Sequence, residues 1–203
     1  MGDPVLIGIR FALYADLMLV AGLAAFPLYA LTREERLRPE LTAMVWRAER
    51  WLCGAGLLVS TLGIGVLAAS MQGVGFLELE LQPFWDLVQQ TDVGAAWIYR
   101  TAALLVALAA SVWMTRRPTL PAGVLAGAGA LAVATLLWSG HAGATEGAAG
   151  TFHRASDILH MLAAAVWIGA ISAFILLLSP ERAGRGSDAL EIASRRLDQF
   201  SIT

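Results

Sequence analysis

Five long apolar runs dominate the pattern of hydrophobic and polar positions along the chain. They occupy about residues 5–31, 51–72, 95–114, 120–139 and 157–178, and polar segments separate them. A helix needs about 20 apolar residues to cross the hydrocarbon core of a bilayer. Backbone groups inside the bilayer must form their hydrogen bonds within the protein, so each run predicts a transmembrane helix. The pattern therefore predicts an all-α polytopic membrane helix bundle.

The charges of the connecting segments predict the orientation of these helices. Residues 32–50 contain five arginines, and further arginines lie at 115–119 and after residue 180. In contrast, residues 73–94 contain four acidic residues and no arginine, and residues 140–156 contain a single arginine. Arginine-rich connections stay in the cytoplasm. We therefore expect the N-terminus outside and the C-terminal tail inside.

The ends of the chain carry two further expectations. The first apolar run has no basic region before it and is too long for the core of a signal peptide, so we expect it to remain as a membrane helix. Residues 187–203 place apolar side chains at nearly helical spacing among charged ones, which is typical of an amphipathic helix on the inner membrane surface. No repeat or low-complexity linker divides residues 1–203, so we expect a single domain.

Composition supports a membrane protein and excludes several other classes. Of the 203 residues, 58% are hydrophobic and 15% are charged, and the mean hydropathy is +0.66. The net charge is −2 without a basic run, so membrane lipid rather than nucleic acid is the expected partner. Cys53 is the single cysteine, which excludes an internal disulfide and a cysteine-based metal cluster.

Four ionisable side chains fall inside the predicted spans, where charge is costly and usually has a function. Arg10, Arg100 and His160 are each about 5 to 10 Å below the outer boundary, from a rise of about 1.5 Å per residue. These three side chains are expected to lie at a similar depth in the membrane, in one layer. Asp16 lies deeper. It is expected either to form a structural ion pair with Arg10 or Arg100, or to belong to a translocation path.

The three histidines lie at the outer side of the predicted bundle. In the segment HRASDILHMLAAAVWIGA, residues 153–170, the spacing of His153, Asp157 and His160 places them in one stripe on a helix. His153 and His160 are about 10 Å apart along the helix axis, too far to share one ion comfortably. His141 follows the fourth span and can approach His160 across a short hairpin. We therefore expect a metal or cofactor site with His141 and His160 as ligands, with His153 and Asp157 beside it.

Two methionines near the predicted histidine site indicate copper as the metal. Imidazole and thioether ligands together suit copper, and Met71 lies at the outer end of the second predicted helix while Met161 follows His160. Each methionine can equally be a packing residue of the core. The expected ligand is a copper ion.

Four segments resemble a known family. They are IRFALYADLMLVAG at 9–22, TDVGAAWIYR at 91–100, SGHAGAT at 139–145 and LHMLAAAVWIGA at 159–170. They are similar to the signatures of the copper resistance protein D (CopD) family of bacterial inner-membrane proteins, and the similarity spans most of the chain. His141, His160, Trp167 and Arg100 carry the match.

The resemblance implies a non-enzymatic role in copper uptake or homeostasis, in company with a small periplasmic copper protein of the CopC type. Family members usually continue with further membrane helices, so a metal site at the outer face is a firmer expectation than a complete transport path. Two alternatives remain open. One is a haem b protein with His141 and His160 as axial ligands and arginines near the propionates. The other is an assembly subunit without a metal.

Overall fold

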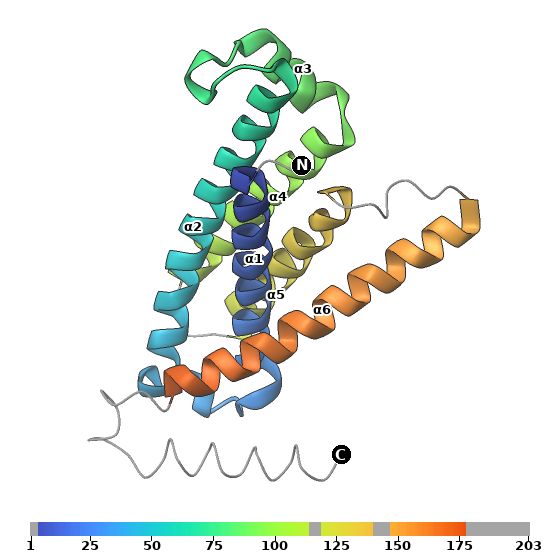
Figure 1. The fold of residues 1–203 in the computed structure, drawn as a ribbon. Coiled ribbons are helices and arrows are strands. Elements are labelled where there is room, and N and C mark those ends of the chain that lie inside the picture. Colours follow the sequence, from blue (N-terminus) through green and yellow to red (C-terminus); the bar gives the residue numbers. More distant parts are fainter. Residues whose placement is uncertain (1–3, 114–118, 140–146, 178–203) are drawn as a thin grey trace.

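The computed structural model describes residues 4–113, 119–139 and 147–177 (Figure 1). The expected surface helix at 187–203 and His141 lie outside the described residues. Within the described ranges the chain forms helices and short connections, without a strand. In chain order these helices are α1 (Pro4–Ala30), η1 (Glu35–Leu37), α2 (Pro39–Gln72), η2 (Phe76–Glu78), α3 (Leu81–Gln90), α4 (Asp92–Val112), α5 (Thr119–Ala134), η3 (Thr135–Ser139) and α6 (Gly147–Leu177).

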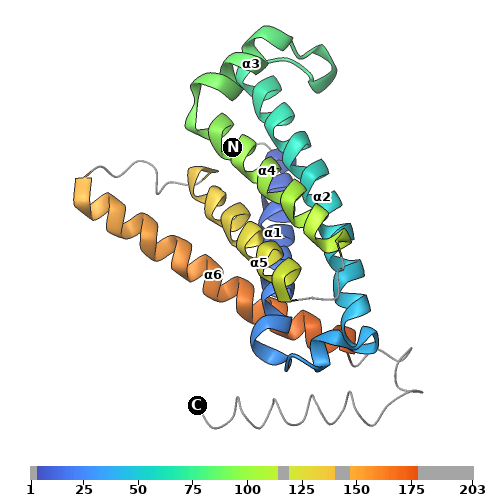
Figure 2. The same cartoon turned by 180° about the vertical axis from the view of Figure 1, so that it is seen from behind.

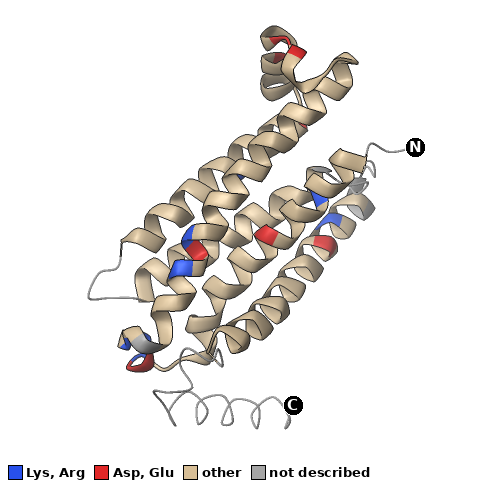
Figure 3. Cartoon of the chain, turned by 60° about the vertical axis from the view of Figure 1, so that its left-hand side comes forward, with Lys and Arg blue, Asp and Glu red and all other residues tan. Residues whose placement is uncertain are grey.

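Five of these helical segments are long and apolar enough to cross a bilayer, which confirms the expected all-α membrane bundle. Figure 3 shows that charged residues gather mainly near the ends of the bundle, with a few at positions inside it. The five segments are Pro4–Ala30, Leu41–Gln72, Asp92–Val112, Thr119–Trp138 and Gly150–Leu177.

The second span begins earlier than the sequence predicted. The expected boundary was residue 51, but α2 starts at Pro39, a residue that is favourable in the first helical turn. Leu41 and Val45 are buried against the ends of α1 and α6, while Arg47 is exposed. Residues 39–50 of the arginine-rich segment are thus the amphipathic first part of a long helix, because their apolar residues recur at helical spacing.

A short amphipathic helix occupies the acidic connection between the second and third spans, which was expected to be a loop. Leu87 and Val88 of α3 are buried in a cluster with Ile64 and Ala68 of α2. The side chain of Thr91 then caps α4 by accepting a hydrogen bond from the Gly94 backbone N–H at 3.1 Å. As a result, α3 is held against the ends of α2 and α4.

Helix α1 lies at the centre of the bundle and contacts α2, α5 and α6 (Figures 1 and 2). At its crossing with α6, Gly22 and Gly169 approach so closely that a Cβ atom on either would collide with the backbone of the other helix. Small residues permit such close approach between membrane helices. This crossing therefore depends on glycine on both helices.

Helix α6 is the least covered of the five spans. Only 22% of its apolar window is buried, compared with 39% to 56% in the other four. Both ribbon views show α6 crossing α1 at an angle and diverging from the bundle toward its N-terminal end (Figures 1 and 2). The N-terminal half of α6, which carries two of the histidines, is thus little covered by the other described helices.

Candidate functional site

Two histidines and an aspartate lie along the accessible half of α6. His153 Nε2 and Asp157 Oδ2 are 3.6 Å apart as an i,i+4 pair, and their side chains are 59% and 42% exposed. His160 follows three positions after Asp157 and is also exposed. At this distance the Asp157 carboxylate lies beside the His153 ring without a hydrogen bond to it, and the nitrogen of a neutral imidazole that carries no proton has a lone pair that can bind a metal.

The other candidate ligands lie elsewhere. Met161 is partly buried and packs with Leu13 and Leu17 of α1, so it does not share the exposed side of His160. Met71 is 68% exposed at the end of α2, and Trp167 is 66% exposed on α6. Across the described ranges, no three His, Cys, Asp or Glu side chains group closely enough to hold a metal ion. The structure thus brings together His153 and Asp157, while the partner expected for His160 is His141, outside the described residues.

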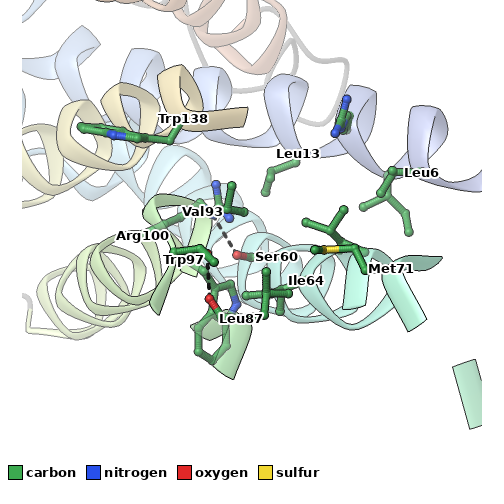
Figure 4. Close-up of a pocket in the computed structure, with 15 residues that line it drawn as sticks. Leu6, Leu13, Ser60, Ile64, Met71, Leu87, Val93, Trp97, Arg100 and Trp138 are labelled. Carbon is green, nitrogen blue, oxygen red and sulfur yellow. Dashed lines mark hydrogen bonds between the residues drawn. The ribbon is translucent and has the colours of Figure 1, made fainter. Parts of the chain in front are cut away.

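A cavity of about 340 Å³ lies between α1, α2 and α4 (Figure 4). Its lining includes Arg10, Arg100 and Met71, whereas His160, which was expected in one layer with the two arginines, is not among the lining residues. The Arg100 side chain is 5% exposed, and its Nε donates a hydrogen bond to Ser60 Oγ at 2.8 Å. No residue of α6 lines the cavity, so the cavity is separate from the histidine stripe.

Asp16 does not form the expected ion pair with Arg10 or Arg100. No contact within 4.0 Å joins its carboxylate to an arginine in the part of the chain that the structure describes. Asp16 is 8% exposed and lies against Gly56 of α2. The pair fails to form because Arg100 is turned toward Ser60, one turn nearer the C-terminal end of α2, and Arg10 is exposed.

Sequence analysis missed a second buried carboxyl group. Glu49 of α2 is 0% exposed, and neither of its side-chain oxygens has a hydrogen-bond partner. It was assigned to a polar connection because arginines surround it. The signal that could have located it is the helical spacing of Leu41, Val45 and Leu52, which continues the second apolar run toward the N-terminus.

Comparisons with known proteins connect this bundle to a family. The family described as "Copper resistance protein D-like, N-terminal domain" matches residues 1–151. Copper resistance protein D of Pseudomonas syringae pv. tomato is 36% identical over 208 residues, covering 98% of this chain and 64% of the relative. Inner membrane protein YebZ of Escherichia coli (strain K12) is 26% identical over 167 residues, covering 81% of this chain and 55% of the relative.

The chain therefore spans less than two thirds of the length of these two relatives. No solved structure matches it significantly. The family match extends from α1 to the first residues of α6, and the similarity to the Pseudomonas protein covers nearly the whole chain. The chain belongs to the copper resistance protein D-like family of multi-pass membrane proteins.

Proposed function

We propose that this protein binds copper at the periplasmic face of the bacterial inner membrane and takes part in copper uptake or homeostasis. Its role is to bind and pass on the ion rather than to catalyse a reaction. The family relationship supports copper as the ligand, because the Pseudomonas relative is named for copper resistance. The observation that carries the proposal is the accessible row of His153, Asp157 and His160 on α6.

The proposed site uses His160 and His141 as ligands. His153 and His160 are seven residues apart, about 10 Å along the helix axis, so one ion cannot easily bind both. His141 is the remaining imidazole of the chain and precedes α6 by six residues. We assign His153 to the entry of the ion, with its ring oriented by Asp157 as outer partners orient metal-binding histidines. Met71 and Met161 are secondary candidates as thioether ligands.

The partner that would deliver copper is a periplasmic protein of the CopC type. Such a protein would approach the accessible half of α6, because the other spans bury more of their surface against one another. Transfer between two copper sites requires ligands that a second protein can reach. The exposure of His153 meets this requirement.

Haem b ligation by His141 and His160 is the alternative, with propionates near Arg10 and Arg100. Among the described residues, the lining of the cavity that holds both arginines contains no histidine and no residue of α6. A haem bound there would need axial ligands other than His153 and His160.

The test is equilibrium copper binding by detergent-purified protein, with an absorption spectrum of each sample. His141→Ala and His160→Ala are expected to lose tight binding, whereas His153→Ala retains affinity but binds more slowly. Leu159→Ala, a change at an exposed neighbour of His160, is the matched control and should bind like the wild type. A stoichiometric Soret band lost in His141→Ala or His160→Ala would instead show a haem protein. Unchanged copper binding in both variants would refute the proposed site.

A further inference from the structure

Two carboxyl groups and a thiol are enclosed inside the bundle, away from the histidines. Asp16 of α1 is 8% exposed, and Glu49 and Cys53 of α2 are each 0% exposed. Asp16 Oδ2 and both side-chain oxygens of Glu49 are buried and have no hydrogen-bond partner among the described residues.

The two carboxyl groups and the thiol lie along one face of α2. Glu49 and Cys53 belong to this helix, and Asp16 of α1 lies against it. Glu49, Cys53 and Gly56 are spaced by four and three residues, so they lie on the same side of the helix, one turn apart. Gly56 makes room for Asp16, because a Cβ atom at this position would collide with Asp16 Oδ2. Cys53 packs with Val20 of α1 between the two carboxyl levels. Asp16 and Glu49 are therefore consecutive polar positions along the interface between α1 and α2.

The outer end of this row lies beneath the cavity. Leu13, Ser60 and Arg100 line the cavity on α1, α2 and α4, and Figure 4 shows the Ser60 and Arg100 side chains joined by their hydrogen bond. One helical turn deeper on the same three helices are Asp16, Gly56 and Leu104, and the side chains of Asp16 and Leu104 both border the space beside Gly56. The cavity thus ends one turn above the Asp16 carboxyl group.

The surroundings decide which ligand these carboxyl groups can take. A buried carboxylate without a donor or a cation is unstable in a membrane, so each group must hold a positive ligand. A metal ion needs several ligands at once, and no group of three suitable side chains exists in the described ranges. A proton needs only one oxygen. Glu49 is completely buried, so a proton can reach it only by transfer from a neighbouring group.

Other charged groups around the pair do not neutralise it. On α4, Arg100 is bound to Ser60. On α2, Arg50 Nη1 donates to the Ser111 carbonyl oxygen at 3.3 Å, and on α1, Tyr14 donates to the Leu136 carbonyl oxygen at 3.4 Å. Helix α5 has no ionisable residue, and the α6 residues packed against α1 near this level are Met161, Leu162 and Ala165.

We propose that Asp16 and Glu49 form an intramembrane proton-binding site that exchanges protons with the outer side through the cavity. In each transfer, the O–H bond of the donor breaks as a new O–H bond forms on the receiving oxygen, and charge moves only with the proton. The site does not depend on copper or on the histidines. Its role is to carry protons within the helix bundle.

The test is infrared spectroscopy of copper-free wild-type protein in detergent at neutral pH. Protonated carboxyl groups give a C=O stretching band that shifts in D₂O, whereas carboxylates do not. Asp16→Asn and Glu49→Gln, which replace each carboxyl with a neutral group of similar shape, should each remove part of this band. Glu80→Gln, at an exposed position outside the bundle, is the control and should leave the band unchanged.

Access through the cavity is tested by the rate at which the band shifts after transfer to D₂O. Gly63→Phe fills the cavity and should slow the shift at least several-fold, whereas Gly123→Phe, where the space beside the glycine is open, should not. Equal rates in both variants would overturn the proposed route. Absence of the band in the wild type would overturn the site even if the carboxyl variants do not fold. Copper that is retained by the wild type and lost in Asp16→Asn or Glu49→Gln would show a metal site instead of a proton site.

Discussion

The Oδ2 atom of Asp16 occupies the space that a Cβ atom on Gly56 would fill. This contact joins α1 to α2 and allows a carboxyl group to lie inside the bundle. Because Leu104 of α4 borders the same space, an added methyl group cannot be accommodated without movement of its neighbours.

Gly56→Ala is therefore expected to destabilise the protein by about 1–3 kcal/mol through overpacking. In an Asp16→Ala background the space is free, and the same change should stabilise by up to about 1 kcal/mol because alanine favours helix more than glycine. A double-mutant cycle of unfolding free energies in detergent measures this change of sign. Equal effects in both backgrounds would show that the two residues do not meet.

Gly22→Ala should weaken the crossing of α1 and α6. The added Cβ would collide with the backbone at Ala165 and Gly169, which cannot move as a side chain can. We expect a loss of about 1–3 kcal/mol in the free energy of unfolding. Gly123→Ala, at an open position on α5, is the control and should not lose stability. Thermal unfolding of both variants in the same detergent provides the comparison.

Ser60→Ala should destabilise the outer end of the bundle because it removes the acceptor of the Arg100 Nε hydrogen bond. Arg100 Nη1 is already buried without a partner, so the guanidinium would have still fewer contacts. A hydrogen bond to a charged group contributes about 1.5–3 kcal/mol, and the loss of stability should fall in this range. Ser70→Ala, at an exposed position of the same helix, should have no measurable effect.

The orientation of the bundle can be tested with single cysteines in a Cys53→Ala background. Glu80→Cys lies in the acidic connection and should react with a membrane-impermeant thiol reagent added to intact cells. Arg33→Cys lies in the arginine-rich connection and should react only after the membrane is opened. Both positions are exposed, so accessibility within the protein does not bias the comparison. Reaction of Arg33→Cys alone in intact cells would invert the orientation.

Acidification should weaken copper binding, because imidazole must be neutral to bind a metal and a bound metal competes with the proton. Asp157→Asn should mainly slow binding, because it removes the partner that orients His153. Stopped-flow and equilibrium titrations at several pH values separate the two effects. Affinity that does not depend on pH would indicate ligands other than histidine.

The sequence alone determined the all-α membrane class of the protein and the five spans that the described residues form. Runs of apolar residues long enough to cross a bilayer can form only helices there, because the backbone must satisfy its own hydrogen bonds. The i,i+4 spacing of His153 and Asp157 likewise required only helix geometry, and the structure places the two side chains 3.6 Å apart. Local periodicity is sufficient for such features because they depend on a single helix.

Contacts between helices were decided by the tertiary structure. Asp16 and Arg100 were expected to pair because each needs a partner, but sequence spacing does not reveal how neighbouring helices are rotated and offset. Packing turned Arg100 toward Ser60 and placed Asp16 against Gly56. The burial of Glu49 arose in the same way, because α2 continues into a segment whose arginines had indicated a polar connection. Which polar groups meet inside this bundle is thus set by helix packing, which a single sequence does not specify.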